Sequence, residues 1–410
     1  MRPSADESAG TQYKGRAGMS LQSLAARSAS GGGAIASKVL LLVAVAVGMG
    51  LAHMSTSTMP LQIGALMDGT HRSAAQAGYF GFAQVAALAL SMIVLAAWVD
   101  RVPPWRTAVA GCVLIVLANL GLFEVSGFAG QLLYGATAGC GYGAVFAATI
   151  AAAAATSEPD RVYAIANGGA LMVVVSVMTS VPVVERARGP LGIFLAIAAV
   201  AFVSAFLLRS LTRGARAEEI QLSAWRTPGA PGLLLAWGAF SAGTGGLYAF
   251  SERIAVHLAL SPDATAWVLS AGVFVGLIGT SAAAILGRRA HRPSVLTVGI
   301  FGSALSCLLI GYAWSLTAYA AGVFAYWIFT MFSYSYLFGT AALLDPRGRV
   351  GTLGGGCDRF GYATGTAIAG LLAEHLSYSA VGVFGFAACA LGALAGFPTL
   401  FRALRREHAT

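Results

Sequence analysis

Five ionisable side chains fall inside apolar stretches that are long enough to cross a lipid bilayer. They are His53, the adjacent pair Glu252 and Arg253, and the adjacent pair Asp358 and Arg359. Such a group costs about 2.5 to 3.5 kcal/mol to insert near the middle of a membrane helix, so it is normally retained for a task. A guanidinium offers a carboxylate a fork of donors, and an imidazole titrates near neutral pH. These residues therefore predict anion binding and proton transfer within a membrane.

The position of each pair along its helix limits what it can contact. Adjacent residues on a helix point about 100° apart, so we expect the two members of each pair to face different partners. Glu252 falls in the outer half of its stretch and Asp358 near the middle, so no Glu252 to Arg359 bridge is expected. Arg359 and Arg253 are candidates for contact with an anionic substrate group, and His53 for proton coupling. The alternative is that these side chains only hold helices together.

Uncharged polar side chains at comparable depth extend the candidate site. Gln84 and Asn119 lie in the second and third apolar stretches. Tyr326 and Tyr334 belong to an aromatic run at residues 324 to 338 and share a rough helical face. Their rings and hydroxyls suit an aromatic or amphipathic ligand. Packing against lipid or against other helices explains much of the run equally well.

Membrane helices must position all of these residues. The 410-residue chain is 57% hydrophobic and 10% charged, which leaves too little polar surface for a soluble protein of this size. A membrane span needs about 20 predominantly apolar residues. We expect twelve spans, at residues 39 to 60, 76 to 98, 107 to 125, 129 to 153, 162 to 184, 190 to 209, 232 to 256, 265 to 286, 294 to 313, 317 to 343, 351 to 373 and 378 to 400.

The two halves of the chain repeat each other. A single shift of 188 residues places Arg161 on Arg349 and Gly168 on Gly356. Parallel half-repeats of this kind build transporters that rock around a central site. We expect two pseudo-symmetric six-helix bundles in an all-α polytopic membrane protein. The expected divisions are a disordered tail at 1–37, a first bundle at 38–209, a central loop at 210–231, a second bundle at 232–401 and a short tail at 402–410.

Basic residues mark one face of the predicted membrane. If both termini lie on the same side, the loops of that side hold most of the arginines, and only Arg72, Arg186 and Arg188 fall opposite. This bias places both termini in the cytoplasm and accounts for the net charge of +9. Nucleic-acid binding is not expected, because it would gather basic residues on one face with stacking aromatics. The preference for Arg over Lys is typical of a GC-rich genome, so we expect a bacterial inner membrane.

The loop after the second predicted span carries a family resemblance. Residues 96–106 resemble the GxxxDRxGRR loop of the major facilitator superfamily, with Asp100 and Arg101 present and the two glycines replaced by Ala96 and Pro103. A glycine-rich fourth span and the arrangement of six plus six spans add to the resemblance, which covers residues 38 to 405. It implies a secondary transporter whose two bundles open a central cavity alternately to either side of the membrane.

The resemblance also implies gating by charged loops on the cytoplasmic side. Asp100 would meet the positive end of the helix that begins near Gly351. The other expected gating residues are Arg101, Arg161, Arg288, Arg289 and Arg349. The alternative is that these charges only set topology. Gln131 stands where the family usually has an arginine, and the fifth span lacks the signature of drug–proton antiporters.

Missing motifs limit the energy source and the chemistry. The chain has only two lysines and no P-loop, so a gradient must drive transport. No His grouping for a metal exists, and no cofactor is expected. The five cysteines fall within predicted spans and are interpreted as packing residues.

We therefore predict a monomeric, proton-coupled transporter of a small organic solute, aromatic or carboxylated, with the solute, protons and the lipid bilayer as its partners. Efflux of drugs or metabolites by the same fold is the first alternative. A non-transporting sensor or scaffold is the second. An intramembrane enzyme is the third, and its only support is an imperfect GxSxG-like segment at residues 239–243, so the chain is not expected to be an enzyme.

Overall fold

Helices make up every regular element in the part of the chain that the computed structural model describes, residues 21–96, 102–156, 158–211, 222–287, 291–345 and 348–407. The first half contains α1 (Leu21–Ser57), α2 (Met59–Thr70), α3 (Ala74–Ala96), α4 (Pro104–Glu124), α5 (Phe128–Ala154), α6 (Pro159–Arg188) and α7 (Gly192–Leu207). The second half contains α8 (Ala230–Ala249), α9 (Ser251–His257), α10 (Pro262–Leu286), α11 (Arg292–Gly311), α12 (Leu316–Leu344), α13 (Arg349–His375) and α14 (Tyr378–Glu407). Two short 3-10 helices, Leu208–Ser210 and Leu222–Arg226, lie between the halves.

The predicted spans correspond in order to these helices, with α1 and α2 sharing the first span and α8 and α9 the seventh. Within the described ranges, ten helices are long and apolar enough to cross a membrane, or up to eleven if the bent pair α8 and α9 counts as one span. α13 is not among them, because Asp358, Arg359 and a run of glycines interrupt its apolar residues. The all-helical membrane architecture is confirmed, and the number of twelve crossings stays a prediction.

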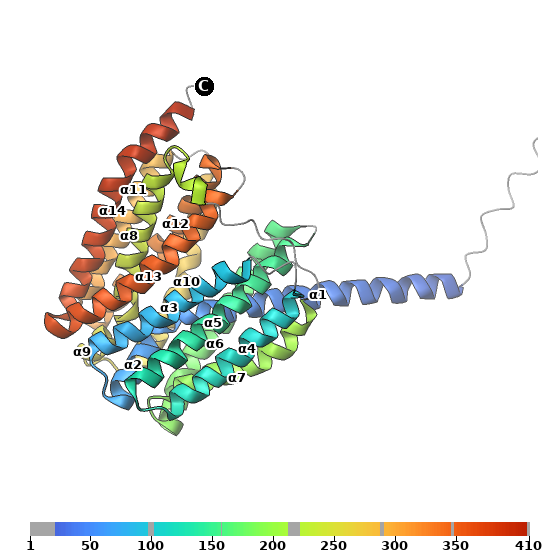
Figure 1. Ribbon diagram of the computed structural model, residues 1–410, viewed down its shortest axis with the longest axis horizontal. Coiled ribbons are helices and arrows are strands. Elements are labelled where there is room, and N and C mark those ends of the chain that lie inside the picture. The colour runs from blue at the N-terminus through green and yellow to red at the C-terminus, as the bar shows by residue number, and fades with distance from the viewer. Residues whose placement is uncertain are drawn as a thin grey trace, which may run out of the picture.

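The first helix begins earlier than the sequence predicts. Residues 1–37 were expected as a disordered tail, yet α1 starts at Leu21 and projects beyond the bundles (Figure 1). Alanines in this segment favour helix and outweigh the glycines at 31 to 33. Residues 1–20 lie outside the described part of the chain. The expected tail therefore does not extend to residue 37.

A proline interrupts the first span near its end, between α1 and α2. Pro60 has no N–H, and its ring crowds the carbonyl four residues earlier, that of Thr56. Accordingly, α1 ends at Ser57 and α2 begins at Met59. The seventh span, at the matching position of the second half, is also broken, with a bend of 40° between α8 and α9.

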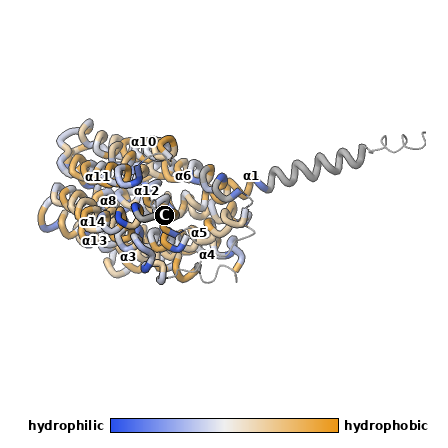
Figure 2. The backbone as a smooth tube through the Cα atoms, turned by 90° about the horizontal axis from the view of Figure 1, so that it is seen from above, coloured by the Kyte–Doolittle hydropathy of each residue, from blue (hydrophilic) through white to orange (hydrophobic). Residues whose placement is uncertain are grey.

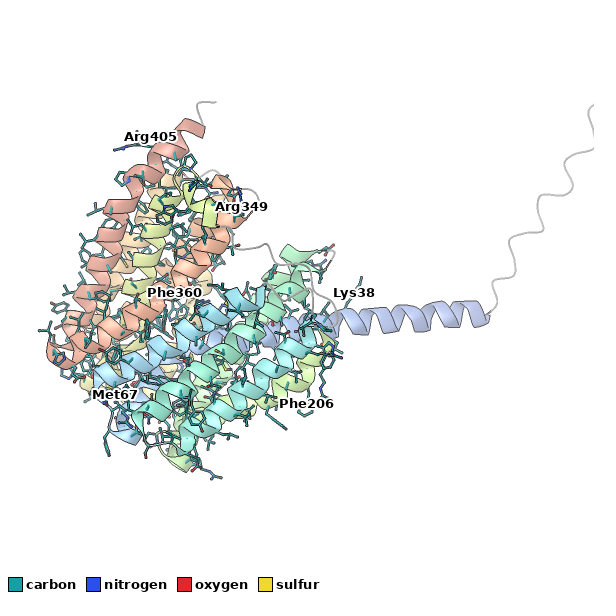
Figure 3. All side chains as sticks on the ribbon, in the orientation of Figure 1. Lys38, Met67, Phe206, Arg349, Phe360 and Arg405 are labelled. Carbon is teal, nitrogen blue, oxygen red and sulfur yellow. The ribbon has the colours of Figure 1, made fainter. Side chains whose placement is uncertain are left out.

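The helices form two bundles, α1 to α7 and α8 to α14, which approach each other near α2 and α9 (Figure 1). We call this the junction end. The ribbons of the two bundles diverge toward the other end, where Figure 3 labels Lys38, Arg349 and Arg405, and we call this the divergent end. The topology prediction makes the junction end the outer one and the divergent end the cytoplasmic one. Along the helices, hydrophobic residues predominate in both bundles (Figure 2).

Glycines allow the closest helix contact between the bundles, that of α3 with α13. A Cβ atom on Gly78 would lie 2.7 Å from the Thr366 carbonyl oxygen, and one on Gly370 would lie 2.6 Å from that of Ala74. Neither position has room for a side chain, so small residues at this crossing let the two backbones touch. A second contact, between α6 and α10, joins the bundles on their opposite flank.

Candidate functional site

Asp358 of the second bundle is a buried carboxylate held by hydrogen bonds from two other helices. It lies in α13 and is 8% exposed. Its Oδ1 accepts a hydrogen bond from the Tyr334 hydroxyl of α12 at 2.7 Å and another from the Ser241 hydroxyl of α8. Ser241 is fully buried. Three helices of one bundle therefore converge on a single carboxylate, and two hydroxyl donors satisfy one of its oxygens.

Arg359 reaches from the second bundle toward the first. Its Nε lies 3.8 Å from Oδ2 of Asp358, which is a long ion pair. Its Cζ lies 6.0 Å from the ring centroid of Phe146 in α5, within the range of a cation–π contact. Among the described residues, no hydrogen bond involves its guanidinium. The fork of donors is therefore available to an anionic ligand.

His53 packs against the same phenyl ring. The imidazole of this α1 residue meets Phe146 edge-on, with ring centroids 5.7 Å apart and an interplanar angle of 81°. Its Nδ1 lies 2.8 Å from the carbonyl oxygen of Met49, so Nδ1 carries the hydrogen and Nε2 is left as the acceptor. The charges of Arg359 and Asp358 are near enough to act on the ring. The central cluster, defined as His53, Phe146, Ser241, Tyr334, Asp358 and Arg359, thus includes both bundles.

The remaining polar candidates make their contacts elsewhere. Tyr326 stacks on Tyr248 of α8 at 5.4 Å and donates to the Thr244 carbonyl at 3.3 Å. Gln84 donates to Gln62 of α2 at 3.0 Å. Asn119 donates to the Ile115 carbonyl of its own helix at 2.8 Å. Each of these three side chains is buried, and none contacts a member of the central cluster through a hydrogen bond in the described residues.

Arg253 forms a clamp between the bundles at the junction end. Its Nη1 and Nη2 donate to the two carboxylate oxygens of Asp68 in α2 at 2.7 and 2.8 Å. Its Nε and Nη2 also donate to Glu252 at 2.5 and 2.6 Å. The guanidinium is 6% exposed. We call these three residues the junction clamp.

The two members of each adjacent charged pair also contact each other. Arg253 binds Glu252 directly, and Arg359 forms its long ion pair with Asp358. An arginine side chain is long enough to fold back on its neighbour, whatever the angle between the two Cβ directions. In addition, Glu252 occupies the first turn of the short helix α9, next to the break in the seventh span.

Further polar contacts hold the junction end together. Arg186 of α6 bridges Asp263 of α10 at 3.1 Å. The amide of Ala75 in α3 donates to Glu374 of α13 at 2.8 Å. Hydrogen bonds from the Ser73 hydroxyl and from this amide hold the pKa of the Glu374 carboxyl below its ordinary value. The sequence did not indicate these contacts or that of Asp68. Charged residues at helix ends cost little free energy to place at a membrane surface, so their presence there does not distinguish them from other charged residues.

Two tyrosines of the second bundle bind the break in the first span. Tyr362 of α13 donates to the Thr56 carbonyl at 3.1 Å, and Tyr248 of α8 donates to the Ser57 carbonyl at 2.9 Å. The Thr56 carbonyl is the one that Pro60 leaves without its helical donor. The proline was a visible signal in the sequence, whereas its tyrosine partners were not.

The predicted gating residues are described only in part. Arg161 pairs with Glu158 at 3.2 Å on an exposed helix start. Arg349 pairs with the buried Asp345 at 2.9 Å, and the Arg349 amide also donates to that carboxylate at 3.0 Å, which caps α13. Asp100, Arg101, Arg288 and Arg289 lie outside the described residues. Their predicted gating role stays a prediction.

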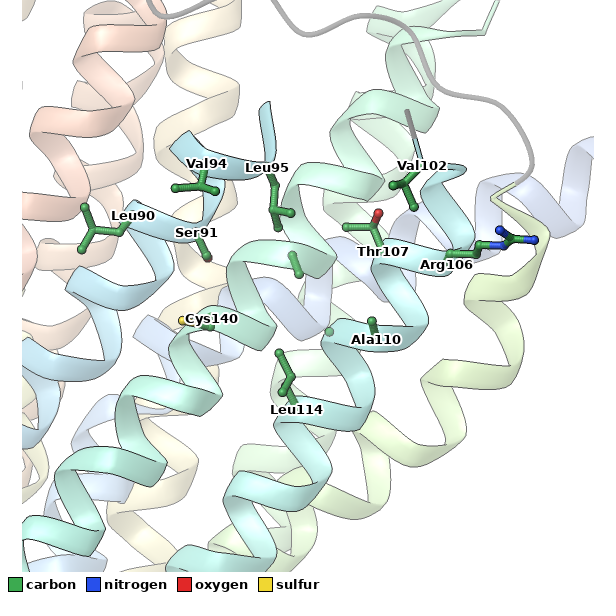
Figure 4. A pocket seen from close by; sticks show the side chains of 12 residues that line it. Leu90, Ser91, Val94, Leu95, Val102, Arg106, Thr107, Ala110, Leu114 and Cys140 are labelled. Carbon is green, nitrogen blue, oxygen red and sulfur yellow. The ribbon is translucent and has the colours of Figure 1, made fainter. Parts of the chain in front are cut away.

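A separate groove of about 670 Å³ lies between α3, α4 and α5 on the first bundle (Figure 4). Its lining is mainly apolar and includes Leu90, Leu114 and Cys140. Arg106 lies at its margin, and in Figure 4 its guanidinium extends away from the other lining side chains. No residue of the central cluster or of the junction clamp lines this groove.

Two solved transporter structures share this architecture. No family model and no curated protein matches the sequence. The structure of a bacterial homolog of the human lysosomal transporter Spinster, inward-facing and unoccupied, matches with a TM-score of 0.66 and 14% identity over 90% of this chain and 95% of that one. The structure of a D-xylose–proton symporter matches with a TM-score of 0.69 and 14% identity over 87% of this chain and 97% of that one. The chain thus has the fold of major facilitator superfamily transporters, as its sequence predicts.

Proposed function

We propose that this protein is a secondary active transporter that moves a small organic solute across a membrane by alternating access. The observation that carries the proposal is the central cluster, in which Arg359 and Asp358 of one bundle face Phe146 and His53 of the other. Ionisable residues placed between two bundles can contact a solute from both sides. The shared fold supports the same reading, because both similar structures are of transporters.

The two ends of the molecule support a gating role for the bundles. The junction clamp, the Arg186 to Asp263 pair and the tyrosine bonds at the first-span break all join the bundles at or near the junction end. The ribbons diverge at the other end (Figure 1). With the predicted topology, this is an inward-facing conformation in a bacterial inner membrane, with both termini cytoplasmic. Opening the outer side would break these contacts.

A proton gradient is the proposed energy source. The sequence contains no P-loop, and His53 and Asp358 offer protonatable groups at the centre. One of the similar structures is of a proton symporter, which supports the proposal by analogy of fold. The proposed partners are one solute, protons and the surrounding lipid, with the chain acting as a monomer.

Transport itself provides the test. A thermal-shift screen of the purified protein against organic acids, aromatics, amino acids and drugs supplies ligands, and each ligand is then tested in counterflow with proteoliposomes. We expect exchange of labelled solute that an imposed pH gradient stimulates. Asp358→Asn and Arg359→Ala should abolish exchange but not membrane insertion, whereas Arg402→Gln, which removes an exposed charge on α14, should retain it. Binding without any exchange would instead indicate a sensor or scaffold, and wild-type rates in both central variants would remove those residues from the mechanism.

A further inference from the structure

The two charged residues of the central cluster differ in how well they are satisfied. Asp358 receives two hydroxyl donors on Oδ1 and faces Arg359 with Oδ2, so it is engaged within its own bundle. Arg359 has only the long ion pair and the face of Phe146. A half-buried guanidinium with unused donors is a site for an acceptor of matching geometry, and a carboxylate provides that match. Asp358 thus positions Arg359 rather than binding solute.

The surroundings of the guanidinium indicate the body of the ligand. Phe146 presents a ring on the side of the first bundle, and Tyr334 presents one on the side of the second, where it packs on Phe240 at 5.5 Å. Planar apolar groups stack on or pack edge-on against such rings. A carboxylate attached to a flat apolar body would therefore contact Arg359 with its head and the aromatic side chains with its remainder.

A bound carboxylate adds a negative charge to the central cluster, and His53 is the residue that can compensate it. Asp358 and Arg359 cancel, so a bound anion would leave one uncompensated negative charge in a partly buried site, which is unfavourable. Nε2 of His53 is the free acceptor nearby, and one proton on it restores neutrality. From α13, Asp358 and Arg359 are the charged groups that act on this imidazole, and α5 presents Phe146 to it. The other helices packed on α1 are α2, α3, α6, α7 and the 3-10 helix Leu208–Ser210, and the charged side chains that the structure describes on them, Asp68, Arg161, Glu185, Arg186, Arg188 and Arg209, lie in terminal turns.

We propose that the central cluster binds a monovalent carboxylate with a planar apolar body together with one proton on His53, so that the two cross the membrane as a neutral pair. The inference rests on the proposed transport function and specifies its substrate class and its coupling. Arg359 binds the carboxylate, Phe146 and Tyr334 contact the apolar body, and His53 holds the proton.

A charge series on one ring tests the anion site. Calorimetry of the purified full-length protein with benzoate, benzamide and benzylamine should show binding of benzoate only. Arg359→Gln should weaken benzoate binding by roughly tenfold to a hundredfold, and Arg359→Lys should weaken it less, because a charged donor remains without the fork. Arg106→Gln removes the same charge at the margin of the groove between α3, α4 and α5, and it should leave benzoate binding unchanged. Preference for benzamide or benzylamine, absence of binding, or loss of binding in Arg106→Gln alone would overturn the inference.

The pH dependence tests the proton on His53. Linked uptake of one proton predicts that benzoate binding weakens by about tenfold for each pH unit above the range in which the imidazole titrates. His53→Gln removes the titrating group, so the slope should disappear. An unchanged slope in this variant would overturn the proton half of the inference. In proteoliposomes, benzoate uptake should be insensitive to membrane potential and driven by the pH gradient, and uptake that responds to potential would contradict neutral cotransport.

A distance measurement separates this inference from the proposed function. Spin labels at Met67 in α2 and Val256 in α9 report the width of the junction end, whatever the substrate is. If the labels show both a short and a long distance but benzoate does not bind, the chain alternates and only the substrate class is wrong. If a single distance persists under all ligands and pH values, the transport proposal fails as well.

Discussion

At the scale of single residues, the carboxylate of Asp358 organises the centre of the molecule. Tyr334 and Ser241 donate to one of its oxygens from two different helices. These bonds fix the carboxylate, which in turn faces the guanidinium of Arg359. A hydrogen bond to a charged acceptor contributes about 1.5 to 3 kcal/mol, more than a bond between neutral groups. The hydroxyl of Tyr334 therefore has a role beyond that of its ring.

Tyr334→Phe tests this role, because it removes the hydroxyl and keeps the ring. We expect a loss of about 1 to 2 kcal/mol in the free energy of unfolding and a several-fold loss of benzoate affinity, smaller than that of Arg359→Gln. Thermal unfolding and calorimetry provide the two measurements. Tyr336→Phe is the matched control, since its hydroxyl donates to the neutral Ala283 carbonyl at 3.4 Å. Equal effects on affinity in both variants would show that the Asp358 bond has no special role.

At the scale of helices, the break in the first span is caused by one proline, and two tyrosines distant in the sequence donate hydrogen bonds to the backbone carbonyls at the break. Pro60 removes the donor that Thr56 would have used in a continuous helix. Tyr362 donates to the Thr56 carbonyl in its place, Tyr248 donates to the neighbouring Ser57 carbonyl, and both tyrosines belong to the opposite bundle. A backbone carbonyl left unpaired in a membrane is costly, so these bonds favour the conformation in which the junction end is closed.

Tyr362→Phe combined with Tyr248→Phe removes both donors. We expect the closed junction to lose about 1 kcal/mol for each bond, which shifts the spin-label distance between positions 67 and 256 toward the longer value. Tyr319→Phe is the control, because its hydroxyl donates to Ser251 at 3.0 Å within the second bundle. It should reduce stability but leave the distance distribution unchanged. A shift in the control, or no shift in the double variant, would refute the proposed role of the two tyrosines.

At the scale of the whole molecule, the bundles are held together at one end by charge. The junction clamp places a buried guanidinium between a carboxylate of the first bundle and one of its own. Separating Asp68 from Arg253 would leave this buried guanidinium with Glu252 as its one charged partner among the described residues, at the cost of the two hydrogen bonds to Asp68. The clamp therefore stabilises one conformation, and the proposed transport cycle needs a compensating gain, such as solute binding, to open it.

Asp68→Asn weakens the clamp and keeps its shape. We expect the open-junction population to rise by about fivefold to a hundredfold, because Arg253 would then retain only Glu252 as a charged partner. The same spin-label pair measures the populations. Arg402→Gln removes one charge from the exposed surface of α14, so it should leave the two populations unchanged. An unaltered distribution in Asp68→Asn would show that the clamp does not set the conformation.

The sequence by itself determined the order of the helices and which charged residues lie inside apolar segments. Apolar length is a local property, so the order of the helices and the positions of Asp358, Arg359 and His53 inside apolar helices could be predicted, and the function of these three residues stays a prediction. The break next to Pro60 also has a local cause, the missing N–H of the proline, and it falls at the end of the span expected at residues 39 to 60. The helical residues 21 to 37 were not predicted, because their composition indicated a tail.

Only the tertiary structure decided which residues meet. Asp68 and Arg253 are 185 positions apart in the chain, and Thr56 and Tyr362 are 306 apart. The same holds for Phe146, which lies between His53 and Arg359 because α1, α5 and α13 converge. Such contacts depend on how whole helices pack and tilt, and that packing is the sum of many weak interactions along each helix. No spacing within one segment encodes it.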